Sequence, residues 1–153
     1  MDIEQTIRDY LPQVVHMSLA TCKEDRPWVC EVHFAYDDEL AIYFRSLVSR
    51  RHSQEIAANP QVAGNIITQH FLEQPGVRGV YFEGHAQKLE SDEDRAKAFA
   101  CLRNRLHVPE AALEESANPE GHQFYKITVE TFYLFDSYTS KPSQKYELVW
   151  GKG

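Results

Sequence analysis

The chain has 153 residues, the size of one domain, and it is acidic, with 16 Lys and Arg against 23 Asp and Glu and a formal net charge of −7. Hydrophobic residues make up 42% and charged residues 25%, with 7 Gly and 7 Pro, which excludes collagen-like, low-complexity and wholly disordered chains. The net charge disfavours a protein that neutralises many phosphates along a nucleic acid, although one bound phosphate is compatible with it. We therefore expect a single globular domain over residues 1–153 that does not bind nucleic acid.

The sequence also argues against a membrane or secreted protein. No apolar run approaches the roughly 20 residues that cross a bilayer, and the first residues are amphipathic and acidic, unlike a signal peptide. The cysteines Cys22, Cys30 and Cys101 are odd in number and form no Cys-x-x-Cys pair, which fits a reducing compartment. We expect a cytoplasmic protein that does not enter a membrane.

Three stretches have the spacing or composition of a helix. Asp2 is placed to cap the first, and Ser91 opens a capping box ahead of the third. Asn59-Pro60 ends the second, because the residue before a proline is pushed out of the α region. We expect helices over residues 3–11, 49–58 and 92–106.

Alternating apolar residues are more frequent than helical spacing and predict a chain dominated by strands. We expect strands over residues 14–20, 28–36, 40–46, 62–67, 77–89, 125–135 and 146–150, the first three as an antiparallel meander. Residues 107–121 are rich in Glu and contain Pro109, Pro119 and Gly121, which predicts a mobile acidic excursion. The economical architecture is a mainly β protein, an antiparallel barrel with peripheral α-helices, because barrel closure hides sheet edges.

Familiar catalytic motifs are absent from the sequence. There is no nucleophile elbow, no phosphate-binding P-loop, no dinucleotide-binding glycine motif and no zinc-protease motif. Seven histidines are scattered along the chain without the spacing of a metal site, so we predict no metal and assign no catalytic residue.

One basic segment stands out in this acidic chain. Between Glu39 and Glu55 it carries Arg45, Arg50 and Arg51 and no acid. The last two, with the histidine that follows, fall at the start of the predicted helix, where the macrodipole disfavours each cation by about 0.3–1 kcal/mol. A bound anion would reverse that sign.

This segment therefore predicts a pocket for one phosphate. The free backbone N–H groups at the helix start, two guanidinium groups and the hydroxyls of Ser46 and Ser49 are suitable donors. The alternative is a solvated basic patch with no ligand, since surface charges commonly contribute little.

The same residues resemble a known family. A strand ending in Phe-x-Ser, a loop, Arg-Arg-His and a helix closed by Asn59-Pro60 is similar to the phosphate-binding segment of the FMN-binding split-barrel superfamily, the pyridoxamine-phosphate-oxidase-like proteins. The run from Arg78 to Gly84 resembles that superfamily's next characteristic block. The chain looks closest to a short, functionally unassigned bacterial branch. The resemblance implies an antiparallel Greek-key split β-barrel, FMN as cofactor, and a homodimer with FMN at its interface.

The resemblance also implies site residues. Ser46 and Arg51 stand where the family contacts the phosphate, and His52 stands where it commonly has Lys. The strand around residues 28–34 would lie beside the flavin ring, and Gly79 replaces the Gln of the oxidases proper. Trp150 is a candidate aromatic from the partner, although Trp150 and Trp28 are more often core residues on composition alone. The predicted cofactor contacts are Cys30, Val32, Arg45, Ser46, Ser49, Arg50, Arg51, His52, Gly79 and Trp150.

The sequence is compatible with three functions. The first is a flavin-dependent oxidoreductase acting on a small molecule, in which His33 is the side chain near the ring able to exchange a proton. The second is a non-catalytic module that binds flavin, or that binds haem through a histidine such as His33 or His85. The third is a dimeric scaffold without a cofactor. No motif names a substrate, and fold analogy does not fix function.

Overall fold

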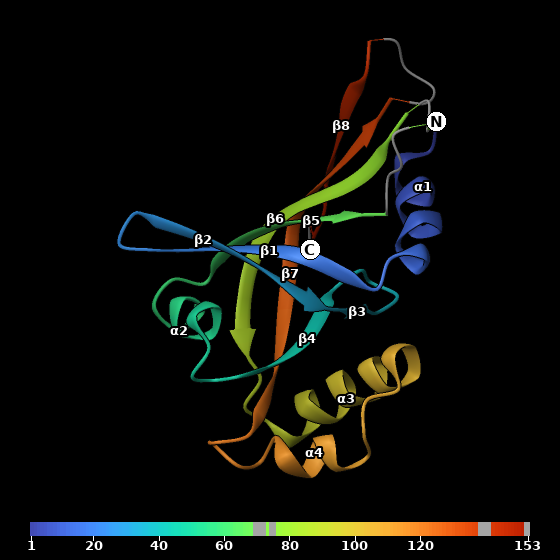
Figure 1. Cartoon of the computed structure of the whole chain (residues 1–153). Coiled ribbons are helices and arrows are strands. Elements are labelled where there is room, and N and C mark those ends of the chain that lie inside the picture. The colour runs from blue at the N-terminus through green and yellow to red at the C-terminus, as the bar shows by residue number, and fades with distance from the viewer. Residues whose placement is uncertain (69–72, 74–75, 138–141, 152–153) are drawn as a thin grey trace.

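The computed structural model describes residues 1–68, 73, 76–137 and 142–151 of the chain (Figure 1). The helices are α1 Ile3–Tyr10, the 3₁₀ turn η1 Leu11–Gln13, α2 Arg51–Ala58, α3 Asp92–Leu106 and α4 Ala111–Glu115. The strands are β1 His16–Lys23, β2 Arg26–His33, β3 Ala35–Tyr36, β4 Ile42–Leu47, β5 Gln61–Ile67, β6 Arg78–Lys88, β7 His122–Asp136 and β8 Gln144–Val149.

All these strands belong to one antiparallel sheet with the order β2-β1-β5-β6-β7-β4-β3, and β8 pairs with the C-terminal half of β7. The sheet curls on itself, and Figure 1 shows α3 and α4 side by side at one end of it, away from α1. The expected mainly β split barrel with peripheral helices is confirmed. Among the described residues, no helix is long and apolar enough to span a membrane.

The expected meander of the first three strands is right in part: β1 pairs with β2, and residues 35–36 pair with β4 across the predicted turn, but β2 itself does not pair with β4. β1 and β2 form a hairpin from His16↔His33 to Lys23↔Arg26, but β4 pairs with β7 at the opposite end of the strand order. The chain leaves the hairpin at Phe34 and Ala35, which are both fully buried. Phe34 belongs to the barrel core and Ala35 to a second core beside α3, so both faces of the chain are covered here, and Ala35 and Tyr36 form β3, which pairs with β4.

Two hydrophobic cores lie on opposite faces of β4. Phe44 belongs to the barrel core, where its ring stacks on Tyr125 with centroids 4.9 Å apart. Its neighbour Tyr43 belongs to a smaller core with Phe124, Ala98 and other residues of α3 and α4. Successive residues of a strand point to opposite faces, so β4 and the start of β7 separate the barrel core from the α3/α4 side.

The helix boundaries follow their capping residues. The Asp2 carboxylate accepts from the backbone N–H of Gln5 at 3.0 Å, and the Ser91 hydroxyl accepts from Asp94 N–H at 3.1 Å, as the sequence predicted. The second helix begins at Arg51, two residues later than expected, with Arg50 as its N-cap residue.

The prediction of a mobile excursion over residues 107–121 is wrong. This segment contains α4, and the side chains of Ala112 and Ser116 are buried against the rest of the molecule. The Ser116 hydroxyl donates to the carbonyl of Leu113 at 2.6 Å, and Arg95 of α3 donates to the carbonyl of Ser116 at 3.3 Å. Small apolar residues and internal hydrogen bonds order a segment whose composition is typical of a loop.

Candidate functional site

A cavity of about 490 Å³ lies where the ends of β2 and β4, the N-terminus of α2 and the C-terminus of α3 meet. Its volume is in the range of small-molecule sites. Five of the predicted contacts line it: Val32, Arg45, Ser46, Arg50 and His52. The remaining lining residues are Glu31, His33, Leu47, Leu102, Leu106, His107, Val108, Pro109 and His122.

The N-terminus of α2 supplies hydrogen-bond donors to this cavity. Arg50 is the N-cap residue, and its side chain makes no capping hydrogen bond. The backbone N–H groups in the first turn of α2 are therefore not capped by a side chain. Arg50 forms no ion pair with any residue the structure describes. Free N–H groups beside an unpaired guanidinium are the features of an anion site.

His52 is buried beside these groups and bonded to Ser46. Its Nε2 lies 2.7 Å from Ser46 Oγ, and its ring lies 6.1 Å from the Phe44 ring. Burial, followed by the nearby charge of Arg50, lowers the pKa of His52 below its ordinary value of 6.5. His52 is therefore neutral at pH 7 and fixes the Ser46 hydroxyl rather than adding a charge.

Arg51 does not line the cavity. Its Nε donates to Glu55 Oε2 at 2.8 Å, and its guanidinium lies 4.2 Å from the centroid of the Trp28 ring. Glu55 also accepts from Thr21 Oγ1 at 2.7 Å, and the hydrogen bonds from Arg51 and then Thr21 hold the pKa of the Glu55 carboxyl below its usual range. The side chain of Trp28 covers Arg51 and is 40% exposed, so the interpretation of Trp28 as a core residue is wrong.

The other predicted contacts lie outside the cavity. Ser49 is exposed in the turn before α2, and Cys30 packs against the barrel core. Gly79 lies in β6, where an added Cβ would come within 3.0 Å of Ile67 Cγ1. Trp150 follows β8, and its Nε1 donates to the Glu39 carbonyl at 2.8 Å. None of these four lines the cavity within one chain.

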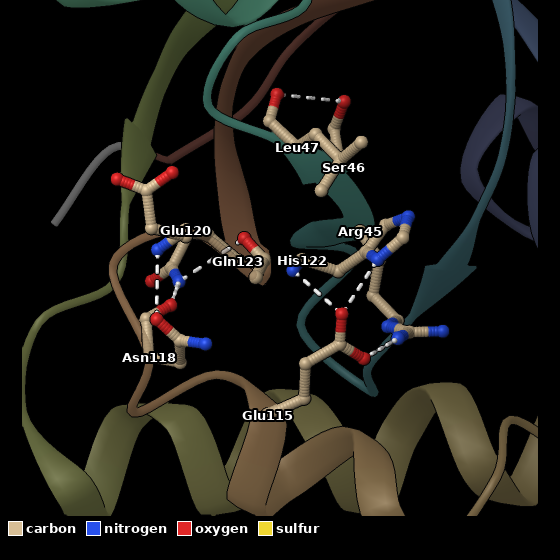
Figure 2. A network of polar contacts seen from close by, with 9 residues as sticks. Arg45, Ser46, Leu47, Glu115, Asn118, Glu120, His122 and Gln123 are labelled. Atoms are coloured by element: carbon tan, nitrogen blue, oxygen red, sulfur yellow. Dashed lines mark hydrogen bonds and ion pairs between the residues drawn. The ribbon is translucent and has the colours of Figure 1, made fainter.

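The opposite wall of the cavity carries a polar network that the sequence reading missed. Figure 2 shows Arg45, Glu115 and His122 joined through the Glu115 carboxylate. Glu115 Oε1 accepts from the His122 backbone N–H at 2.9 Å and lies 2.8 Å from His122 Nδ1, and Oε2 accepts from Arg45 at 3.0 Å. The His122 backbone and side-chain hydrogen bonds hold the pKa of the Glu115 carboxyl below its usual range.

Four histidines face the cavity: His33, His52, His107 and His122. The other candidate haem ligand, His85, lies outside it, with Nδ1 3.1 Å from Glu130 on the sheet surface. Within the described ranges, no three His, Cys, Asp or Glu side chains are grouped to hold a metal ion.

The fold agrees with a comparison of the sequence with known families. Residues 3–136 match the family described as Pyridoxamine 5'-phosphate oxidase. The chain belongs to that family. This match includes all the elements from α1 to β7, so the family assignment covers the whole cavity.

Members of the pyridoxamine 5'-phosphate oxidase family and its fold have varied names. The UPF0306 protein plu4501 of Photorhabdus laumondii is 32% identical over 103 residues, which are 65% of this chain and 70% of that protein. The structure of a FAD-binding protein from Mesorhizobium loti is 22% identical, with a TM-score of 0.66 over 90% of this chain and 95% of its own. HutZ, the haem storage protein of Vibrio cholerae, is 18% identical, with a TM-score of 0.69 over 100% of this chain and 98% of its own. At these identities the two structures establish the fold alone.

Proposed function

We propose that this protein binds FMN with its phosphate at the N-terminus of α2 and works as a flavin-dependent oxidoreductase on a small molecule in the cytoplasm. The observation that carries the proposal is the cavity itself, where Ser46, Arg50 and the uncapped first turn of α2 meet beside the end of β2. Membership of the pyridoxamine 5'-phosphate oxidase family and the FAD-binding structural neighbour support it.

The donor set of the cavity fits a phosphate-bearing ligand. Arg50 has no ion-pair partner among the described residues, and the Ser46 hydroxyl is held by neutral His52. The buried Nε–H of Arg45 also finds no acceptor within the described part of the chain, and a buried donor without a partner is costly unless a ligand or water satisfies it. The Arg45 Nε–H is thus the donor of this cavity that calls for an acceptor, while Arg50 is an exposed cation available to an anion.

The residues around the phosphate have distinct roles in this proposal. Ser46, Arg50 and the α2 N–H groups bind it, while Arg51 is engaged by Glu55 and Trp28 outside the cavity. Val32 of β2 lines the wall along which the ring would lie. FMN supplies hydride and single-electron transfer when bound, and the chain binds it, orients it and excludes water.

We also propose a homodimer, in which β2 is part of the interface. β2 is an edge strand, and Val29 and Trp28 on it and Val15 before β1 are exposed apolar residues. Exposed apolar residues on an edge strand commonly mark a protein contact. Sedimentation at micromolar concentration checks this proposal, and a species of 17.7 kDa alone would contradict it.

Titration calorimetry with FMN and riboflavin tests the flavin proposal. The two ligands share the ring and the ribityl chain, so the phosphate is the difference between them. We expect FMN to bind and riboflavin to bind much more weakly, because the phosphate takes the charge-assisted contacts. Equal affinities would show that the basic segment does not hold a phosphate.

Haem binding is the second candidate, and the histidines in the cavity wall favour it. His33 lies at the exposed end of β2 and His107 just beyond α3, so neither is enclosed by the core. The structural likeness to a haem storage protein supports this candidate. Haemin titration gives a Soret band that is lost in a His33→Ala or His107→Ala variant if haem binds here. Binding of neither haemin nor FMN would favour the dimeric scaffold without a cofactor.

A further inference from the structure

Arg45 and His122 lie on a different side of the cavity from the phosphate donors. In the β4–β7 ladder, Arg45 is opposite Phe124 and Leu47 is opposite His122. Phe124 belongs to the α3/α4 core, whereas Phe44 and His52 pack together on the barrel side. Because side chains alternate along a strand, Ser46 serves the barrel side and Arg45 and His122 serve the α3/α4 side.

Glu115 fixes the His122 ring in one orientation. One carboxylate oxygen receives the backbone N–H of His122 and faces its Nδ1, while the other oxygen receives Arg45. The carboxylate is ionised at neutral pH because its pKa is lowered, and an ionised carboxylate accepts hydrogen bonds only. Nδ1 of His122 must therefore carry the hydrogen, and the neutral ring has its lone pair on Nε2.

The chain makes room for this arrangement at Gly121. A Cβ at that position would lie 2.7 Å from Glu115 Cγ and 2.8 Å from the Glu115 carbonyl oxygen. Glycine is thus the residue that allows the carboxylate to approach the start of β7. The chain therefore has its smallest residue at the place where Glu115 and His122 come into contact.

Nε2 of His122 is directed away from the carboxylate, as Figure 2 shows for the second ring nitrogen. His122 lines the cavity, its side chain is 42% exposed, and no described residue hydrogen-bonds to Nε2. We infer that His122 contacts the molecule that fills the cavity by accepting a hydrogen bond from an N–H or O–H group of it, and that Glu115 is its positioning residue. This inference rests on the proposed function for the identity of that molecule, and the donor belongs either to the flavin or to the substrate.

Two other histidines are internal controls. His16 lies 2.7 Å from Glu31 and His85 lies 3.1 Å from Glu130, so both rings face a carboxylate as His122 does. Neither lines the cavity, and neither shares its carboxylate with an arginine. A contact made only for surface stability would behave alike at all three positions.

The first experiment uses the ligand-free protein and needs no flavin. Histidine ¹⁵N NMR of the neutral rings should show His122 as the Nδ1–H tautomer. Glu115→Ala should shift it toward the Nε2–H tautomer that dominates in free histidine, and Glu115→Gln should retain the original tautomer because its amide oxygen still accepts. Unfolding curves confirm that both variants are folded. A His122 tautomer unchanged in Glu115→Ala would overturn the positioning role of Glu115.

The second experiment maps modification of the histidines by diethyl pyrocarbonate, which attacks the free imidazole nitrogen. At FMN near 100 times its Kd, His122 should react about 100-fold more slowly, and His85, whose partner Glu130 lies outside the cavity, should react at an unchanged rate. Protection by FMN alone assigns the donor to the flavin. The second mixture adds NADPH, the reducing small molecule used as the probe substrate, and protection seen only in that mixture assigns the donor to the substrate. If calorimetry shows FMN bound and His122 is protected in neither mixture, the contact is overturned while the proposed function stands. If FMN does not bind, the proposed function fails and the tautomer result alone decides the role of Glu115.

Discussion

The two walls of the cavity differ in how the sequence encodes them. The barrel-side wall comes from one continuous stretch, Ser46 to His52, whose positive charge is conspicuous in an acidic chain. The α3/α4 wall joins Arg45 to Glu115 and His122, residues up to 77 positions apart. A local cluster at a helix start can be recognised from sequence, whereas a contact between distant residues depends on the register of β4 and β7.

The largest effect on FMN affinity should come from removing the arginines at the start of α2. The double variant Arg50→Ala/Arg51→Ala should weaken FMN binding by about 2.7 kcal/mol, a hundredfold, because the charge-assisted contact from Arg50 is lost together with the positive charge of Arg51 on the same helical turn. Arg50→Ala alone should cost at least about 1.4 kcal/mol. Calorimetry measures both, with Lys88→Ala, at an ion pair with Glu90 outside the cavity, as the control. Unchanged affinity in the folded double variant would remove the phosphate from this wall.

A smaller effect should follow from crowding the opposite wall. Gly121→Ala places a methyl group against Glu115, and overpacking of this kind costs about 1–3 kcal/mol of folding free energy. Urea unfolding measures the loss. The control is Ala117→Gly, in the exposed turn after α4. Gly64→Ala is unsuitable because its added Cβ would also collide, 2.4 Å from the Phe82 ring. Wild-type stability in Gly121→Ala would mean that Glu115 moves away without cost.

The folding stability contributed by the barrel-side wall should depend on pH, because His52 lies on that wall. The folded state holds the pKa of His52 below its ordinary value of 6.5, so the unfolded chain binds the proton first. The stabilisation is complete above that value and is lost as the pH falls from it toward the folded pKa. Wild-type protein should lose more stability than His52→Gln between about pH 7.5 and 5.5. Parallel losses in urea unfolding would contradict a buried neutral His52.

The smallest effect is expected at the exposed pair on the sheet surface. His85→Ala removes the contact with Glu130, and exposed pairs of this type contribute little, so stability should stay within about 0.5 kcal/mol of wild type. His122→Ala provides the matched comparison on the cavity wall. If both substitutions have the same effect on stability and on FMN affinity, the wall offers no more than a surface contact.

The order of the elements could be predicted because periodicity and capping are local properties. Each of the seven expected strands is present with ends within three residues of expectation, and Asp2 and Ser91 cap their helices. The break at Phe34 was missed, since an apolar residue that continues an alternating pattern gives no sign of a change of sheet partner. The strand order depends on long-range pairing, which periodicity does not contain.

The candidate site was predicted in part. Ser46, Arg50 and His52 meet in the cavity, but Arg51 turns to Glu55 and Trp28 because a buried carboxylate one helical turn away is a strong partner. Glu115 was read as one of several acids in a loop, and His122 as one of seven scattered histidines. Gly121 was the available signal, though its meaning depends on the close approach of Glu115 that only the structure displays.

The central position of β7 also has a consequence for synthesis of the chain. β7 pairs with β6, β4 and β8, and β4 has only the two-residue β3 on its other side among the described strands. Ser46 pairs with Gln123, which the ribosome adds 77 residues later. At about 5–20 residues per second, β4 waits roughly 4–15 s for its partner. During that interval the β1–β2 hairpin and its pairing with β5 can form, while the apolar face of β4 remains a target for chaperones.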